Sequence, residues 1–137
     1  MSDIIVTTAR HDSFPEFLNL NGFSVEILDN NIIQAVRDGE MPVFISMGDE
    51  VVYFEVDLGP INEVLSKELL FELLDANTEV IPVSFAINSA NAEDPRLVLV
   101  ESREAGDLCD KEVLAVFDGL ELAVDRAESI LQKYMKA

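Results

Sequence analysis

Basic residues are scarce in this sequence. Its 137 residues contain nine Lys and Arg against 27 Asp and Glu, which gives a formal net charge of −18. Nucleic acids and anionic membranes are bound through cationic side chains, because each phosphate contact needs a positive partner. The composition therefore argues against DNA, RNA and anionic lipid surfaces as partners.

Cysteine and histidine occur once each and tryptophan not at all, so an intramolecular disulfide is excluded. The longest uncharged stretch covers residues 80–92, far short of the roughly 20 apolar residues that a membrane-spanning helix needs. The N-terminus has no cationic start followed by a long apolar run, which a signal peptide would show. We therefore expect a cytoplasmic protein that does not insert directly into a membrane.

What the sequence has in quantity is apolar side chains. Hydrophobic residues make up 49% of a 15.2 kDa chain, which is sufficient for one self-contained core. No internal repeat, low-complexity tract or linker divides the chain. We expect a single domain spanning residues 1–137.

Two turn signals organise the region from residue 31 to residue 58. Asp38-Gly39 and Gly48-Asp49 are typical of the two-residue turns that join antiparallel strands. They separate three β-prone segments, residues 31–37, 40–47 and 50–58. The spacing predicts a three-stranded antiparallel meander.

Two-residue turns would also set the register of the meander. Counting outward from each turn places Ile33, Phe44 and Tyr53 in one cross-strand row, with Val51 beside it. The opposite face would then form the core, with Ile32, Val36, Met41, Val43, Ile45, Met47, Val52, Phe54 and Val56.

The second half of the chain changes from a period of two to a helical period. Ser66 is a suitable cap for a helix over residues 67–76, with Leu69, Leu70, Leu73 and Leu74 as its buried stripe. Two strands follow, over residues 80–87 and 96–103. Pro82 indicates that the first of them begins late or lies at a sheet edge.

A long helix is predicted over residues 110–135. Apolar residues recur there with the heptad spacing of a packed seam, at Val113, Phe117, Leu120, Val124, Ala127, Leu131 and Tyr134. At about 1.5 Å per residue the helix would be roughly 39 Å long. It must cross the whole sheet or reach another subunit, and the second possibility predicts a homodimer.

The expected fold class is therefore α+β. An antiparallel sheet of about five strands, made from the meander and the later pair, would carry the long C-terminal helix on one face. Residues 13–20 are expected to form a short helix and residues 23–28 a short strand.

Few residues suggest catalysis. His11-Asp12-Ser13 has the residue types of a hydrolase triad, but triads are assembled from separated segments. Cys109 stands far from the single His, and the acidic clusters do not follow a calcium-loop pattern. We predict no enzyme activity, no catalytic residues, no cofactor and no metal site. Two alternative functions stay open: a small carboxylate- or metal-dependent enzyme, and an acidic inhibitor that mimics nucleic acid.

The second face of the meander is the candidate functional surface. Its row is either a second core layer, covered by residues 4–28 or by another subunit, or an exposed groove for a partner segment. On the second interpretation the partner-binding residues are Ile33, Phe44, Val51 and Tyr53.

The order of elements, the small size and the acidity resemble the class I type III secretion chaperones, which are Tir chaperone-like. Locally the sequence is similar to the uncharacterised bacterial YjfI-like family, through Leu69–Leu74, Ile81–Ile87, Arg96–Val100 and the helix Leu114–Tyr134. The resemblance implies a homodimeric, non-enzymatic interaction module, chaperone-like or regulatory. It also implies a protein partner, either a secreted client or a PspA-like membrane-stress protein. Pro15 and Gly22 depart from the longer first helix of the chaperones.

Overall fold

The structure, a computed structural model, describes residues 13–29 and 32–135. It contains one antiparallel sheet, a long helix and two shorter helices. The six strands lie in the order β1-β2-β3-β4-β6-β5. The elements are α1 (Ser13–Leu20), β1 (Phe23–Asp29), β2 (Ile32–Arg37), β3 (Val43–Met47), β4 (Val51–Pro60), η2 (Asn62–Val64), α2 (Lys67–Ala76), β5 (Ser84–Asn88), β6 (Arg96–Glu104), η3 (Ala105–Asp107) and α3 (Asp110–Leu131). The predicted α+β architecture is confirmed, with β1 as a sixth strand.

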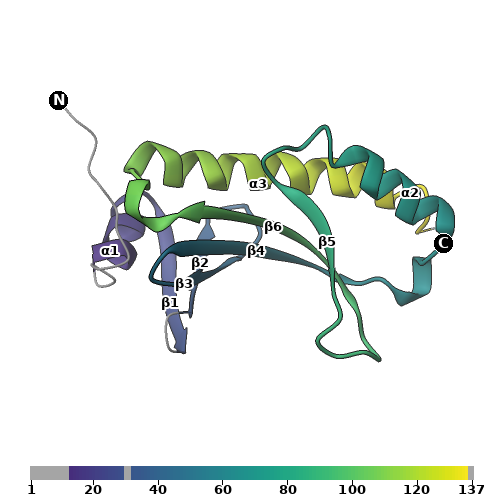
Figure 1. Cartoon of the computed structure of the whole chain (residues 1–137), viewed down its shortest axis with the longest axis horizontal. Helices are drawn as coiled ribbons and strands as arrows, with labels where there is room; N and C mark the ends of the chain where they lie inside the picture. The colour runs from purple at the N-terminus through teal and green to yellow at the C-terminus, as the bar shows by residue number, and fades with distance from the viewer. Residues whose placement is uncertain (1–12, 30–31, 136–137) are drawn as a thin grey trace.

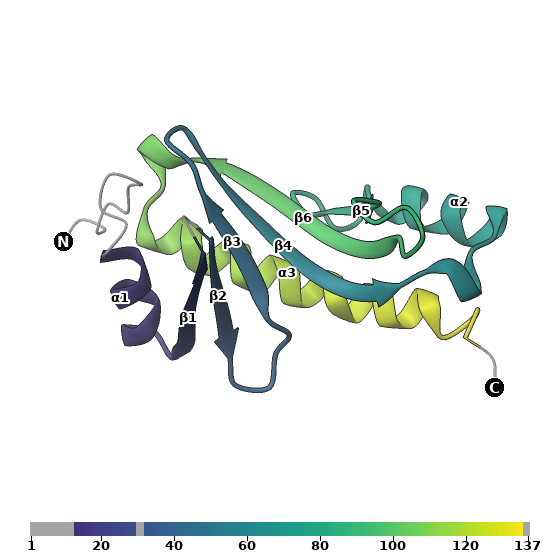
Figure 2. The same ribbon diagram turned by 90° about the horizontal axis from the view of Figure 1, so that it is seen from below.

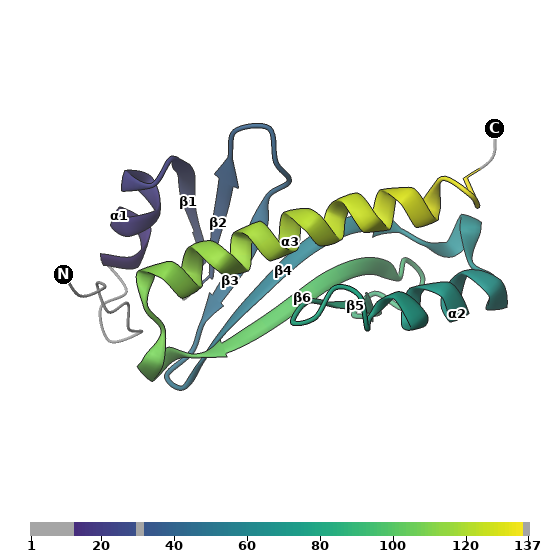
Figure 3. The same ribbon diagram turned by 90° about the horizontal axis from the view of Figure 1, so that it is seen from above.

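The long helix α3 crosses the sheet on one face only (Figures 1 and 3). The short helix α1 lies beside β1, and α2 lies at the opposite end of the molecule near the end of α3 (Figure 2). Among the described residues, no helix combines the length and the apolar character that spanning a membrane requires.

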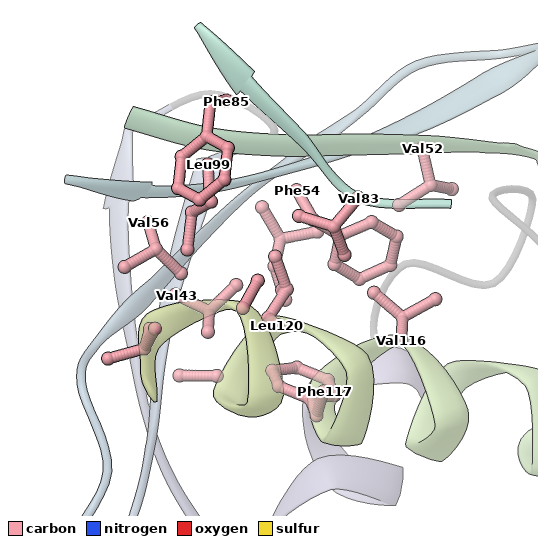
Figure 4. Close-up of a cluster of buried hydrophobic side chains, with 14 of the residues drawn as sticks. Val43, Val52, Phe54, Val56, Val83, Phe85, Leu99, Val116, Phe117 and Leu120 are labelled. Atoms are coloured by element: carbon pink, nitrogen blue, oxygen red, sulfur yellow. The ribbon is translucent and has the colours of Figure 1, made fainter. Parts of the chain in front are cut away.

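The core lies between α3 and the sheet, where side chains from both elements meet in one cluster (Figure 4). The Phe117 ring of α3 packs 4.3 Å from that of Phe23 and 6.0 Å from that of Phe54, measured between centroids. The predicted heptad seam lies here, with Val113, Phe117, Leu120, Val124 and Ala127 buried and with Leu131 and Tyr134 partly buried. The seam packs within the chain, so it does not supply the dimer contact that its length suggested.

Helix α2 begins as predicted, because the Ser66 hydroxyl oxygen accepts a hydrogen bond from the Leu69 amide at 3.0 Å. Its buried face consists of Leu69, Leu73 and Ala76. The predicted stripe is wrong in two places, since Leu70 is 36% exposed and Leu74 67% exposed. Leu70 and Leu74 lie beside the buried face, so α2 also exposes apolar side chains to solvent.

The predicted register between β2 and β3 is wrong by one residue. Ile33 lies opposite Ile45, not opposite Phe44. The turn at Asp38-Gly39 does form, with a 2.9 Å hydrogen bond from the Glu40 amide to the Arg37 carbonyl oxygen. The ladder resumes only at Val43, because Pro42 has no N–H to donate to it.

A shift of one residue exchanges the two faces of a strand. Ile33 and Ala35 are therefore in the core, at 5% and 0% exposure, while Ile32 and Val36 lie on the other face. The register between β3 and β4 differs from the prediction by two residues, with Ile45 opposite Phe54. An even shift preserves the faces, so Val51 and Tyr53 still lie opposite the core.

The prediction for the strand containing Pro82 is confirmed. Strand β5 begins only at Ser84 and forms one edge of the sheet. It pairs with β6, whose Leu97 and Leu99 are buried.

Candidate functional site: the open face of the sheet

The face of the sheet that points away from α3 is the candidate functional site. No helix of the described residues covers it, and Figure 2 shows β4 and β6 in front of α3 when this side is viewed. Alternation along the paired strands places on it the apolar residues Ile32, Val36, Phe44, Val51, Tyr53, Ala86, Val98 and Val100. We call this surface the open face.

Phe44 and Tyr53 lie on neighbouring strands of the open face. Phe44 is opposite Glu55, and Tyr53 is opposite Ser46, so the two aromatic residues are diagonal neighbours rather than a direct pair. Diagonal positions remain within reach of aromatic side chains. Phe44 is half-buried, whereas Tyr53 is 38% exposed and Val51 46% exposed. Three of the four predicted site residues thus lie together on one accessible surface.

Ile33 does not belong to this surface. Its side chain is 5% exposed and contributes to the core, which corrects its predicted place in the row. Ile32 takes that position instead, at 36% exposure. The signal in the sequence is Pro42, because a residue without an amide proton cannot donate to the ladder so close to the turn.

A polar network crosses the open face at Glu55. The Tyr53 hydroxyl donates to Glu55 Oε1 at 2.8 Å, and the Asn88 amide donates to Glu55 Oε2 at 3.4 Å. Burial, followed by the hydrogen bond to Glu55, raises the pKa of Tyr53 to about 12. The network holds the Tyr53 ring in place and keeps a carboxylate at the centre of the face.

The open face is acidic as well as apolar. Glu26, Glu55, Asp57 and Glu104 lie on it by strand alternation. Among the described residues, Arg96 is the one basic side chain on the open face. Arg96 forms ion pairs with Asp57 and with Asp94, each at 3.2 Å. A ligand for this surface would combine apolar side chains with positive charge.

The apolar residues of the open face are less exposed on β6 than on β2, β3 and the start of β4. Val98 is 2% exposed although it lies outside the main core cluster, next to Asp57 and Ala86 in the ladder. Accessibility rises toward Tyr53 and Val51. The accessible apolar area is therefore over β2, β3 and the start of β4.

A second apolar surface lies on α2, and the sequence prediction missed it. Phe71 is 63% exposed and Leu74 67% exposed. A groove of about 140 Å³ runs between α2 and β5, with Leu70, Leu73, Leu74, Phe85, Ala86, Ile87 and Leu97 along it. The sequence did contain a sign of this exposed surface, because the segment Leu69–Leu74 has more large apolar residues than one buried face of a helix needs.

The residues considered for catalysis do not form a site in the described part of the chain. His11 and Asp12 lie outside it. Cys109 is a half-buried free thiol at the start of α3. The buried carboxylate Glu101 is bound by Arg103 at 2.6 Å, and Arg103 also contacts Glu112 at 3.2 Å. No group of three potential metal ligands occurs among the described residues.

No protein-family model and no curated protein matches this sequence. Solved structures do match it. The chaperone in the heterodimeric complex ExoU–SpcU of the type III secretion system of Pseudomonas aeruginosa aligns with a TM-score of 0.67 and 19% identity, over 84% of this chain and 94% of the other.

Two further solved structures share the fold. The Yersinia pestis type III secretion chaperone SycH, in complex with a stable fragment of YscM2, aligns with a TM-score of 0.57 and 16% identity, over 84% of this chain and 93% of the other. YbjN of E. coli, a putative transcription regulator, aligns with a TM-score of 0.54 and 15% identity, over 94% and 90%. The chain therefore has the α+β fold of type III secretion chaperones.

Proposed function

We propose that this protein is a non-enzymatic interaction module, chaperone-like or regulatory, that binds an extended segment of a partner protein on its open face. The observation that carries the proposal is the accessible cluster of Phe44, Val51 and Tyr53. The core between α3 and the sheet is complete without these residues. An exposed apolar surface with a polar margin is typical of protein interaction sites.

Charge complementarity defines the partner segment. The open face has four carboxylates and one paired arginine, within a chain of net charge −18. A segment with apolar anchors interleaved with Lys or Arg would fill the cluster and neutralise Glu55 and its neighbours. Extended segments bind sheets by placing alternate side chains in surface pockets.

The solved complexes support a protein partner. One similar structure is a heterodimeric complex with ExoU, and another holds a fragment of YscM2. A secreted or PspA-like partner comes from the sequence resemblance alone, and a cytoplasmic location is an expectation from the sequence.

A carboxylate- or metal-dependent enzyme is the alternative, and it would need convergent carboxylates of shifted pKa. In the described part of the chain, the two carboxylates with shifted pKa lie on different helices. Hydrogen bonds from Lys133 and Tyr134 lower the pKa of Glu72 on α2. Burial, with the nearby Glu40 and Asp125, raises the pKa of Glu121 on α3. Each shift thus has a local structural cause.

The test is binding of synthetic peptides to the full chain and to the variant F44S/Y53S. Peptides alternating apolar residues with Lys should bind the wild type, and the same peptides with Glu for Lys should not. The variant should lose binding, and NMR shifts in the wild type should centre on Phe44, Val51 and Tyr53. The variant L122S is the control, because Leu122 is 71% exposed on α3, which packs on the other face of the sheet. Equal binding by F44S/Y53S and wild type would refute the proposal.

A further inference from the structure

A cavity lies at the end of the hydrophobic core, between the end of β4, η2 and the end of α3 (Figure 2). Its volume is about 260 Å³. The described residues that line it are apolar with one exception, and the apolar ones include Leu58, Ile61, Val64, Leu97, Leu131 and Met135. Because Leu131 belongs to α3, the cavity lies on the helix-covered side of the sheet. It is therefore separate from the open face, and the proposed function does not use it.

The cavity forms where the chain leaves the sheet while α3 continues. The ladder between β4 and β6 shifts its register between Asp57 and Gly59, and Gly59 has φ +115°. Such a bulge bends a strand, and β4 ends directly after it. Ile61 and Leu97 form the floor of the cavity, at 1% and 3% exposure. Met135, at 63% exposure, lies at its mouth, where a flexible thioether side chain adapts to the shape of a ligand.

Backbone amides around the cavity are already hydrogen-bonded. The Gly59 amide donates to Asp57 Oδ1 at 2.9 Å, and the Ile61 amide donates to the Pro95 carbonyl oxygen at 3.2 Å. The Val64 amide donates to the Ile61 carbonyl oxygen at 3.1 Å. These three amides need no polar partner from a ligand, and the side chains beside them are apolar. The cavity therefore favours an apolar body over water.

Glu63 is the exception among the lining residues, and it sets the charge that a ligand needs. Its side chain is exposed and forms no ion pair within the described residues. Among those residues, no Lys, Arg or His lines the cavity. The net charge of −18 adds to the local negative potential. A cationic head group would therefore be attracted to the cavity, and an anionic one repelled.

We propose that this cavity binds a small organic cation with an apolar body, such as an arylalkyl ammonium ion. An apolar cavity of about 150 Å³ is sufficient for benzene, so a cavity of about 260 Å³ accommodates a phenyl ring and a short chain. Drug-sized ligands need roughly 300–1,000 Å³. The ring would pack on Ile61 and Leu131, with the ammonium group beside Glu63. The inference goes beyond the proposed function, because it concerns the other side of the sheet and a small molecule.

The first experiment titrates the isotope-labelled full chain with phenethylammonium and follows its methyl groups by NMR. The shifts should saturate and centre on Ile61, Val64 and Leu131, with a dissociation constant of about 1 mM or below. Phenethyl alcohol, which has the ring without the charge, should bind more weakly. Phenylpropionate, which has a negative charge, and methylammonium, which has no ring, should not cause these shifts.

The second experiment changes the cavity itself. Val64→Phe fills it with an aromatic ring and should abolish binding of phenethylammonium. Glu63→Gln should weaken that binding about threefold to fivefold, as expected for one exposed ion pair, and should leave binding of phenethyl alcohol unchanged. Glu16→Gln is the matched control, because it removes the same charge from α1, at the opposite end of the molecule, and should change neither affinity. Far-UV circular dichroism establishes that each variant is folded.

Three results would overturn the inference. They are an absence of saturable shifts at the cavity, binding of phenylpropionate as tight as that of phenethylammonium, and a Glu63→Gln variant that binds the cation as tightly as Glu16→Gln does. These results decide the question even if Val64→Phe does not fold. Peptide binding at the open face is measured with F44S/Y53S, so the two proposals can fail separately.

Discussion

The Tyr134 hydroxyl donates a hydrogen bond of 2.8 Å to Glu72 Oε1, which joins the end of α3 to the middle of α2. Lys133 binds the other oxygen of the same carboxylate. Glu72 lies next to the buried Leu73, so this contact joins α2 to α3 beside the buried face of α2.

The variant Glu72→Gln should therefore be less stable than the wild type at neutral pH. The hydrogen bond from Lys133, then that from Tyr134, lowers the pKa of Glu72. A lowered pKa contributes stability above the unfolded-state value of 4.5 that is lost as the pH falls through the folded-state value. Urea unfolding at neutral and acidic pH should show a difference between wild type and variant that shrinks on acidification. A difference that stays constant would contradict this.

Phe44 and Phe54 should respond differently to truncation. Phe54 is fully buried, so Phe54→Ala should cost about 3–5 kcal/mol. Phe44 is half-buried on the open face, and Phe44→Ala should cost about 1–2 kcal/mol. Chemical denaturation measures both. A loss for Phe44→Ala as large as that for Phe54→Ala would show that the open face is a second core layer.

Most elements of this fold could be predicted from the sequence, because their signals are local. Ser66 caps α2 through its own side chain, and the heptad spacing of α3 follows from one buried face. The turn at Asp38-Gly39 forms where predicted, with Gly39 at φ +82°. Such features depend on residues a few positions apart.

The candidate site was harder to predict, because it depends on register. A register shift of one residue between β2 and β3 places Ile33 in the core instead of on the expected surface, while Phe44 and Tyr53 keep their places. The outer side of α2 was misassigned for a related reason. Periodicity shows that Leu69, Leu70, Leu73 and Leu74 are apolar neighbours, but only the packed structure shows that two of them face outward.

Tyr53 should make stability sensitive to alkaline pH. Its pKa is raised from 10.0 to about 12, by burial first and by Glu55 second. The contribution of a raised pKa is present below the unfolded-state value and is lost as the pH rises toward the folded-state value. Between about pH 9 and about pH 11 the wild type should lose more unfolding free energy than Tyr53→Phe. Glu55→Gln should show an intermediate loss, because burial remains; an equal loss in all three proteins would contradict the assignment.

Self-association should strengthen as ionic strength rises. Each copy carries a net charge of −18, and this long-range repulsion is screened over about 10 Å at about 0.1 M salt. Salt also weakens exposed ion pairs, but these contribute only about 0–1 kcal/mol each. Screening of the repulsion should therefore dominate. Light scattering in increasing NaCl measures the outcome, and a chain that stays monomeric at high salt and high protein concentration would contradict the homodimer.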